Sequence, residues 1–232
     1  QQRVDRTGLQ HEYWTQILPD RLPTVQVRDD DGALTLVSTP VPTLAATATA
    51  ARDLADQEVV PGETDGTGSD DAEEVEGLTE LGALGRAVTL EMDVSWDDAA
   101  EAAVTVVGSA DGSRGTRITL GGGQMRVDRS GSVLTQSAAG AVDGGAGAAD
   151  DAGPDGAAEP FSGLTAAIAP IDPAARSAHL QILVDTQSVE VFVDDGYTVL
   201  SQQVHLLPGD TGASLYADGG PLHATAITLR EH

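Results

Sequence analysis

The sequence predicts an all-β fold, a two-sheet antiparallel β-sandwich of the jelly-roll or concanavalin-like type, on three observations. Apolar and polar residues alternate with period two in about eleven short segments, which is typical of strands with one buried face. Turn sequences rich in Gly and Asp separate many of these segments. No long segment has a helical period of apolar residues. Two such sheets would pack their apolar faces together, about 10 Å apart.

The first predicted strands form a hairpin. Residues 24–28 and 33–38 flank the turn sequence Asp29-Asp30-Asp31-Gly32. Because Gly and Asp suit the tight turns of hairpins, we expect the two segments to pair in antiparallel fashion.

The next predicted strands lie in the middle of the chain. Residues 88–94 alternate apolar and polar side chains without a fault, and residues 102–106 continue the pattern after a turn. Residues 118–120 and 125–127 follow, on either side of the glycine run at 121–123. This succession is typical of a meander of antiparallel strands.

The C-terminal quarter shows the pattern most clearly. It holds five predicted strands, at residues 180–184, 189–193, 197–204, 212–217 and 222–230. Asp194-Asp195-Gly196 and Asp218-Gly219-Gly220 are turn sequences that would close two further hairpins.

Two acidic low-complexity tracts interrupt the strands, at about residues 53–85 and 137–159. The first holds eleven acidic residues and no basic one, and the second has nine Ala and six Gly among its 23 residues. Such compositions offer little apolar surface to bury, so both tracts are interpreted as flexible, solvated insertions. Short helices at residues 43–57 and 71–84 are an alternative for the flanks.

The charge of the chain excludes several classes of partner. There are 12 basic and 37 acidic side chains, which give a formal net charge of −25. Nucleic acid and anionic membrane surfaces both need clustered basic residues, so neither is expected as a partner. No apolar run approaches the roughly 20 residues that span a bilayer. The absence of Cys excludes disulfides, thiolate metal sites and a cysteine nucleophile.

Residues that could carry chemistry are present without a catalytic or metal-binding spacing. The five His residues are far apart, and no pair has the spacing of metal ligands on one strand. Glu190 and Asp194 would share one strand face about 13 Å apart, which is too far for two carboxyl groups that act together in catalysis. Gly121-Gly122-Gly123 lacks the lysine and the strand-to-helix setting of a phosphate loop. No cofactor and no metal are therefore expected.

Two tryptophans are candidate contacts to carbohydrate or to another domain. The chain has only seven aromatic residues with which to stack on a sugar. Trp96 follows a predicted strand and precedes Asp97-Asp98, so it is the best candidate for exposure, although packing in the core or an interface is favoured. Trp14 lies in the N-terminal segment and is a candidate contact between modules.

One segment resembles a known family. Leu180–Asp185 followed by Ser188–Gly196 is similar to the strand pattern I-x-V-D-x-S-S-V-E-V-F-V-N-D-G of the C-terminal β-sandwich of glycoside hydrolase family 32, which contains invertases, levanases, inulinases and sucrose-6-phosphate hydrolases. Val199-Leu200-Ser201 and Gly212–Gly220 match its next two motifs. Upstream, the segment Trp14–Leu22 followed by Asp31–Leu34 and Pro40-Val41 resembles the family's junction between domains more weakly, and Leu18–Leu22 departs from the family's wording L-P-R-E-L.

The resemblance implies an accessory role rather than catalysis. Family 32 enzymes hydrolyse β-fructosides on a five-bladed propeller that precedes the sandwich, with motifs Asn-Asp-Pro-Asn-Gly, Arg-Asp-Pro and Glu-Cys. None of these strings occurs in this chain. Residues 1–23 are then the junction after a missing catalytic propeller, and residues 24–232 are the sandwich with its two insertions. Within the motif, Asp185, Ser188, Glu190, Phe192 and Gly196 are expected to serve the fold or an interface.

The expected function is a non-catalytic C-terminal module that stabilises the propeller of a retaining β-fructosidase. Its expected partners are that propeller and a second copy of the chain in a homo-oligomer, and an exposed apolar patch is expected where the propeller packs. The alternative is an independent module that binds fructan or another carbohydrate. A structural or adhesive β-domain is a third reading. The cytoplasm is slightly favoured over secretion.

Overall fold

The computed structural model describes residues 24–30, 33–40, 44–61, 78–85, 87–97, 101–109, 114–132 and 165–232. The strands in these ranges are β1 (Thr24–Asp30), β2 (Ala33–Thr39), β3 (Ala50–Asp53), β4 (Gln57–Val59), β5 (Leu78–Ala83), β6 (Val88–Trp96), β7 (Glu101–Gly108), β8 (Thr116–Gly121), β9 (Gln124–Asp128), β10 (Ala166–Pro170), β11 (Ser177–Asp185), β12 (Ser188–Val193), β13 (Thr198–Gln203), β14 (Gly212–Asp218) and β15 (Leu222–Glu231). Three short 3-10 turns accompany them: η2 (Ala45–Thr47), η3 (Ser130–Ser132) and η4 (Asp194–Gly196).

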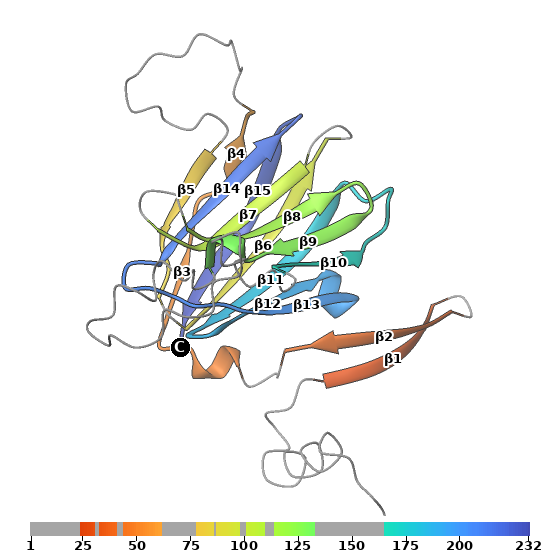
Figure 1. Cartoon of the computed structure of the whole chain (residues 1–232). Helices are drawn as coiled ribbons and strands as arrows, with labels where there is room; N and C mark the ends of the chain where they lie inside the picture. Colours follow the sequence, from red (N-terminus) through yellow and green to blue (C-terminus); the bar gives the residue numbers. More distant parts are fainter. Residues whose placement is uncertain are drawn as a thin grey trace, which may run out of the picture.

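Two antiparallel sheets make up the main body, as Figure 1 shows. A six-stranded sheet has the order β10-β9-β8-β7-β14-β5, and a seven-stranded sheet has the order β13-β12-β11-β6-β15-β3, with β4 also paired to β15. This arrangement confirms the predicted all-β sandwich. No helix in the described ranges is long and apolar enough to cross a membrane.

The core lies between the two sheets. Alternate side chains of the central strands, such as β6, β8, β11 and β14, point inward. The largest fully buried ones include Leu90, Met92, Leu180 and Ile182 of the seven-stranded sheet and Ile118, Leu120, Met125 and Leu215 of the six-stranded sheet. Full burial of one such side chain contributes about 1.5–3 kcal/mol. The apolar side chains of the alternating pattern therefore hold the two sheets together.

All eleven predicted strands are present, and four more were not predicted. These are β3, β4, β5 and β10. Every residue of β3 is exposed, so its side chains carry no apolar alternation. Its place in the sheet comes from backbone pairing to β15, which a sequence pattern does not reveal.

The helices considered at residues 43–57 and 71–84 are wrong in the described part of both segments. The first contains the single turn η2 and then β3 and β4, and the second ends in β5. The insertion expected at 53–85 is likewise wrong at its flanks, since β4 and β5 belong to the sheets. Its centre and the tract at 137–159 lie outside the described residues.

The predicted N-terminal hairpin forms, but β1 and β2 pair only with each other among the described strands. Their register runs from Thr24 opposite Thr39 to Asp30 opposite Ala33. Figure 1 shows this two-stranded sheet apart from the two main sheets, with β2 contacting η4 and β13. The hairpin is therefore a separate element beside the sandwich rather than part of either main sheet.

Candidate functional site

The segment Asp185–Gly196, singled out in the sequence, folds into the β11–β12 hairpin and the turn after it. Asp185 and Ser188 face each other across the hairpin, and an Asp185 Oδ1 atom accepts a hydrogen bond from the Thr186 amide at 2.6 Å. Val189, Val191 and Val193 point into the core, and Glu190 is half-buried on the outer face. Phe192 is the exception on that outer face, because it is large, apolar and only 5% exposed.

The turn η4 has an unusual backbone that brings β2 close to it. Asp194, Asp195 and Gly196 have φ values of 49°, 57° and 87°, in the left-handed region where Asp and Gly are most readily tolerated. A Cβ atom built on Gly196 would overlap the Ser38 carbonyl group. Only Gly lets the β2 backbone approach this closely, so Gly196 is the seat for the end of the N-terminal hairpin.

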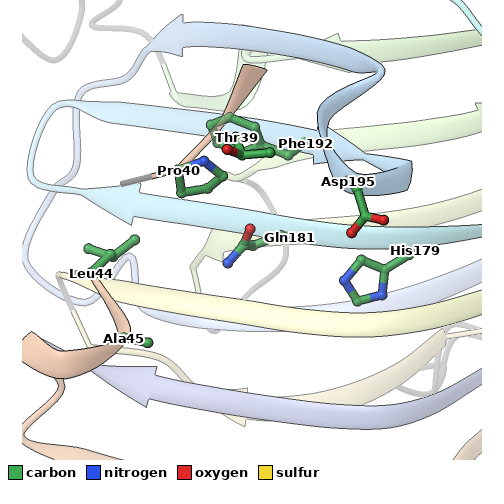
Figure 2. A pocket seen from close by; sticks show the side chains of 8 residues that line it. All are labelled: Thr39, Pro40, Leu44, Ala45, His179, Gln181, Phe192 and Asp195. Carbon is green, nitrogen blue, oxygen red and sulfur yellow. The ribbon is translucent and has the colours of Figure 1, made fainter. Parts of the chain in front are cut away.

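A pocket of about 260 Å³ lies beside this seat. Its lining comes from the end of β2, from η2 and its N-terminal neighbour, from the outer face of the seven-stranded sheet and from η4: Thr39, Pro40, Leu44, Ala45, His179, Gln181, Phe192 and Asp195. Figure 2 shows Gln181 in the middle of this set, with Pro40 and Phe192 on one side and His179 and Asp195 on another. The pocket thus explains why a buried Phe192 occurs on the polar face of β12.

A charged network borders the pocket on β6, β11 and β15. The His179 Nδ1 atom lies 2.8 Å from Asp93 Oδ1, and its Nε2 atom lies 3.7 Å from Glu91 Oε1. Arg230 donates to Glu91 at 2.6 Å. The His179 amide donates to Asp194 Oδ1 at 2.9 Å, which ties β11 to the turn. Both ring nitrogens of His179 therefore face carboxylates already.

The η2 side of the pocket is anchored by His232. Its Nδ1 atom lies 3.0 Å from the Thr47 hydroxyl and its Nε2 atom 2.9 Å from the Thr89 hydroxyl. The Thr49 amide also donates to the Glu231 carbonyl oxygen at 2.7 Å. The segment before β3 is therefore held on β6 and β15.

A second polar cluster joins two loops at another place on the sandwich. Arg114 Nε donates to Asp210 Oδ2 at 2.9 Å, with the side chains 20% and 4% exposed, and Arg114 also donates to the His205 carbonyl oxygen at 2.9 Å. Asp210 accepts a second hydrogen bond from the Leu207 amide. These contacts join the loop before β8 to the loop before β14.

The remaining candidate residues are dispersed or covered. Trp96 is 5% exposed in the core, which agrees with the favoured reading of core packing, so its ring is not available for stacking on a sugar. Trp14 lies outside the described residues. No group of three or more His, Asp or Glu side chains within the described ranges could hold a metal ion.

The exposed large apolar side chains of the described residues fall at two edges of the sandwich. Val60 and Leu78 lie near β4 and β5, and Ile168 and Tyr197 lie near β10 and β13. These two edges are at opposite ends of the sheet orders. The described surface therefore has two small apolar areas instead of the single patch that we expected.

The pocket was not predicted from the sequence. Thr39, Pro40, Leu44 and Ala45 reach it only because of the close approach at Gly196 and the anchoring of η2. The one sequence signal was Phe192, an aromatic residue at a position where the alternation of β12 calls for a polar side chain.

Comparison with known proteins identifies one family and its relatives. The profile of the family described as "Glycosyl hydrolases family 32 C terminal" matches residues 57–231. The levanbiose-producing levanase of Bacillus subtilis (strain 168) is 28% identical over 210 residues, which cover 89% of this chain and 33% of the levanase.

Solved structures show the same fold. The exo-inulinase from Aspergillus awamori matches with a TM-score of 0.61 and 18% identity over 90% of this chain and 35% of the inulinase. Fructan 1-exohydrolase IIa from Cichorium intybus matches with a TM-score of 0.60 and 11% identity over 90% of this chain and 40% of that enzyme. The chain thus spans about a third of the length of these relatives.

Proposed function

Since the chain belongs to glycoside hydrolase family 32, as the C-terminal domain of that family, we propose that it is a non-catalytic module that stabilises the catalytic propeller of a β-fructosidase. Its relatives are named as a levanase, an exo-inulinase and a fructan exohydrolase, so the substrate class of the whole enzyme is sucrose or fructans. Residues 1–23 are the junction to the propeller in this proposal.

The described residues hold no reactive carboxyl pair, which supports a non-catalytic role. A retaining glycosidase needs two carboxyl groups about 5 Å apart, one as nucleophile and one as acid/base. Glu91 and Asp93 are neighbours on the outer face of β6, but Arg230 pairs with the first and His179 with the second. Neither carboxylate lines the pocket. The sequence also lacks all three catalytic strings of the family.

The N-terminal hairpin supports packing against another domain, and it is the observation that carries the proposal. An isolated two-stranded sheet is marginally stable in water. The outer edges of β1 and β2 have no partner among the described strands, and such edges readily accept a further strand. The Gly196 seat fixes this hairpin next to the sandwich. A neighbouring propeller would cover the hairpin and gain a fixed contact to the module.

The interface would be largely polar. The exposed apolar side chains occur only as two small groups in the described surface, and interfaces between domains of one chain are typically of this polar kind. The same surfaces are available to a second copy of the chain, so homo-oligomerisation is a secondary part of the proposal.

The proposal is tested with the purified chain and with the enzyme that carries it. The chain alone should release no fructose from sucrose, inulin or levan. Removal of residues 24–232 from the enzyme should lower its thermal inactivation temperature by several degrees while the KM for sucrose stays within about twofold. Fructose release by the chain alone, or unchanged stability after the deletion, would refute it.

A further inference from the structure

We propose that the pocket between the hairpin end, η2 and the outer face of the seven-stranded sheet binds one ring of a neutral sugar. The choice of fructose-containing sugars as its occupants rests on the proposed function, whereas the ligand class rests on the chemistry of the pocket. Nothing in the family match assigns a ligand to this position.

The polar groups that line the pocket select for a neutral, hydroxylated ligand. The Gln181 carboxamide and the Asp195 carboxylate make no hydrogen bond or ion pair within the described residues, while His179 is engaged by Asp93 and Glu91. An anion would meet the Asp195 carboxylate with no free cationic group in the lining to balance it. A divalent metal ion would need more oxygen ligands than these side chains offer. A purely apolar ligand would strip both groups of water without replacing their hydrogen bonds.

A sugar ring can interact with both the polar and the apolar residues that line the pocket. Each hydroxyl can donate to the Asp195 carboxylate and exchange hydrogen bonds with the Gln181 carboxamide. Pro40, Leu44, Ala45 and Phe192 provide apolar walls for the C–H faces of the ring. Cross-strand pairing places Gln181 directly beside Phe192, so a polar group and an apolar wall lie side by side.

The pocket is held in shape before any ligand arrives. Thr39 and Pro40 follow Ser38, which is fixed against Gly196. On the other side, His232 ties η2 to β6. The hydrogen bond from the His179 amide to Asp194 holds the turn that presents Asp195. A preformed pocket costs less ordering entropy on binding than a flexible one.

The test is a titration of the chain, followed by amide chemical shifts, with sucrose, levan-derived and inulin-derived oligosaccharides and the fructose-free sugar maltotriose. The expected result is saturable binding of the fructosides, with shifts at Gln181 and Asp195. Asp195→Asn should weaken binding by at least about tenfold, because a charge-assisted hydrogen bond is lost, and Asn tolerates the left-handed backbone of this position. Gln181→Leu should weaken it to a similar extent.

Asp218→Asn is the matched control, since Asp218 is also an exposed Asp beside a hairpin turn but lies at the β14–β15 connection, away from the pocket. This variant should bind as the unaltered chain does. Unchanged affinity in both pocket variants, or binding of none of the sugars, would overturn the proposal. Saturable binding of butylammonium chloride without binding of any sugar would also overturn the proposal, because the pocket would then select an organic cation. Binding of maltotriose but not of fructosides would support a sugar pocket and count against the proposed fructosidase function.

Discussion

Gly196 joins two parts of the molecule that are far apart in the sequence. Its φ of 87° favours Gly, and the Ser38 carbonyl group occupies the space that any Cβ would need. Both the position of the hairpin and one wall of the pocket depend on this contact. A residue that the sequence marks only as a turn former therefore has a second role in the tertiary structure.

We predict that Gly196→Ala destabilises the chain more than Gly209→Ala does. Gly209 also has a positive φ, 99°, but nothing lies within 4 Å of a Cβ built there. The control should cost about 1–2 kcal/mol for the left-handed backbone alone. Gly196→Ala should cost about 1–3 kcal/mol more, because of the overlap with Ser38. Urea unfolding measures both, and equal costs would contradict the role of the close contact.

Asp128 predicts a pH dependence of stability. Burial alone would raise the pKa of its carboxyl, but hydrogen bonds from Arg126 and Ser130 outweigh this and hold the pKa below its ordinary value of 3.8. A lowered pKa in the folded state gives stability that is present above the ordinary pKa and is lost as the pH falls through the lowered value. Melting temperatures between about pH 5 and about pH 2 should therefore fall less steeply in Asp128→Asn than in the unaltered chain. Parallel curves for the two proteins would argue against this.

At the scale of elements, two loops of the sandwich are joined by a partly buried ion pair between Arg114 and Asp210. Arg114 precedes β8, and Asp210 lies just before β14, and no backbone ladder connects the two residues. Their side chains supply that connection together with hydrogen bonds to the His205 carbonyl and the Leu207 amide. Removal of Asp210 leaves the partly exposed Arg114 guanidinium and the Leu207 amide without their carboxylate partner.

Asp210→Ala should therefore destabilise the chain by about 1.5–3 kcal/mol, the range for a lost hydrogen bond to a charged group. Arg126→Ala is the control, because the Arg126–Asp128 pair is exposed, with Arg126 45% accessible, and exposed pairs contribute about 0–1 kcal/mol. Thermal unfolding at pH 7 distinguishes the two variants. Similar small losses in both would mean that Arg114 and Asp210 are not a structural link.

The same scale shows which elements a sequence pattern reveals. β6 and β11 were predicted because one face of each is buried and the other is polar. β3 was not, since all four of its side chains are exposed and only its backbone joins the sheet. The pocket was missed for a related reason, because its lining comes from β2, η2 and β11, whose proximity depends on one Gly contact and one His bridge.

For the whole molecule, most of the net charge of −25 comes from two segments of the sequence and not from a charged binding site. Residues 53–85 and 131–175 contain seventeen of the acidic residues and no basic one. The rest of the chain has a charge balance that is ordinary for a small domain. Two packed sheets with paired surface charges and a separate unpaired hairpin suit a module that stabilises a neighbour better than they suit a catalyst.

The most direct measurement of this claim compares thermal inactivation of the enzyme that carries this chain, with and without residues 24–232. We predict that the truncated enzyme still hydrolyses sucrose with a similar KM and loses activity several degrees earlier. Loss of hydrolysis at temperatures where the truncated enzyme remains folded would mean that the module contributes to catalysis, and an unchanged inactivation temperature would mean that it does not stabilise its neighbour.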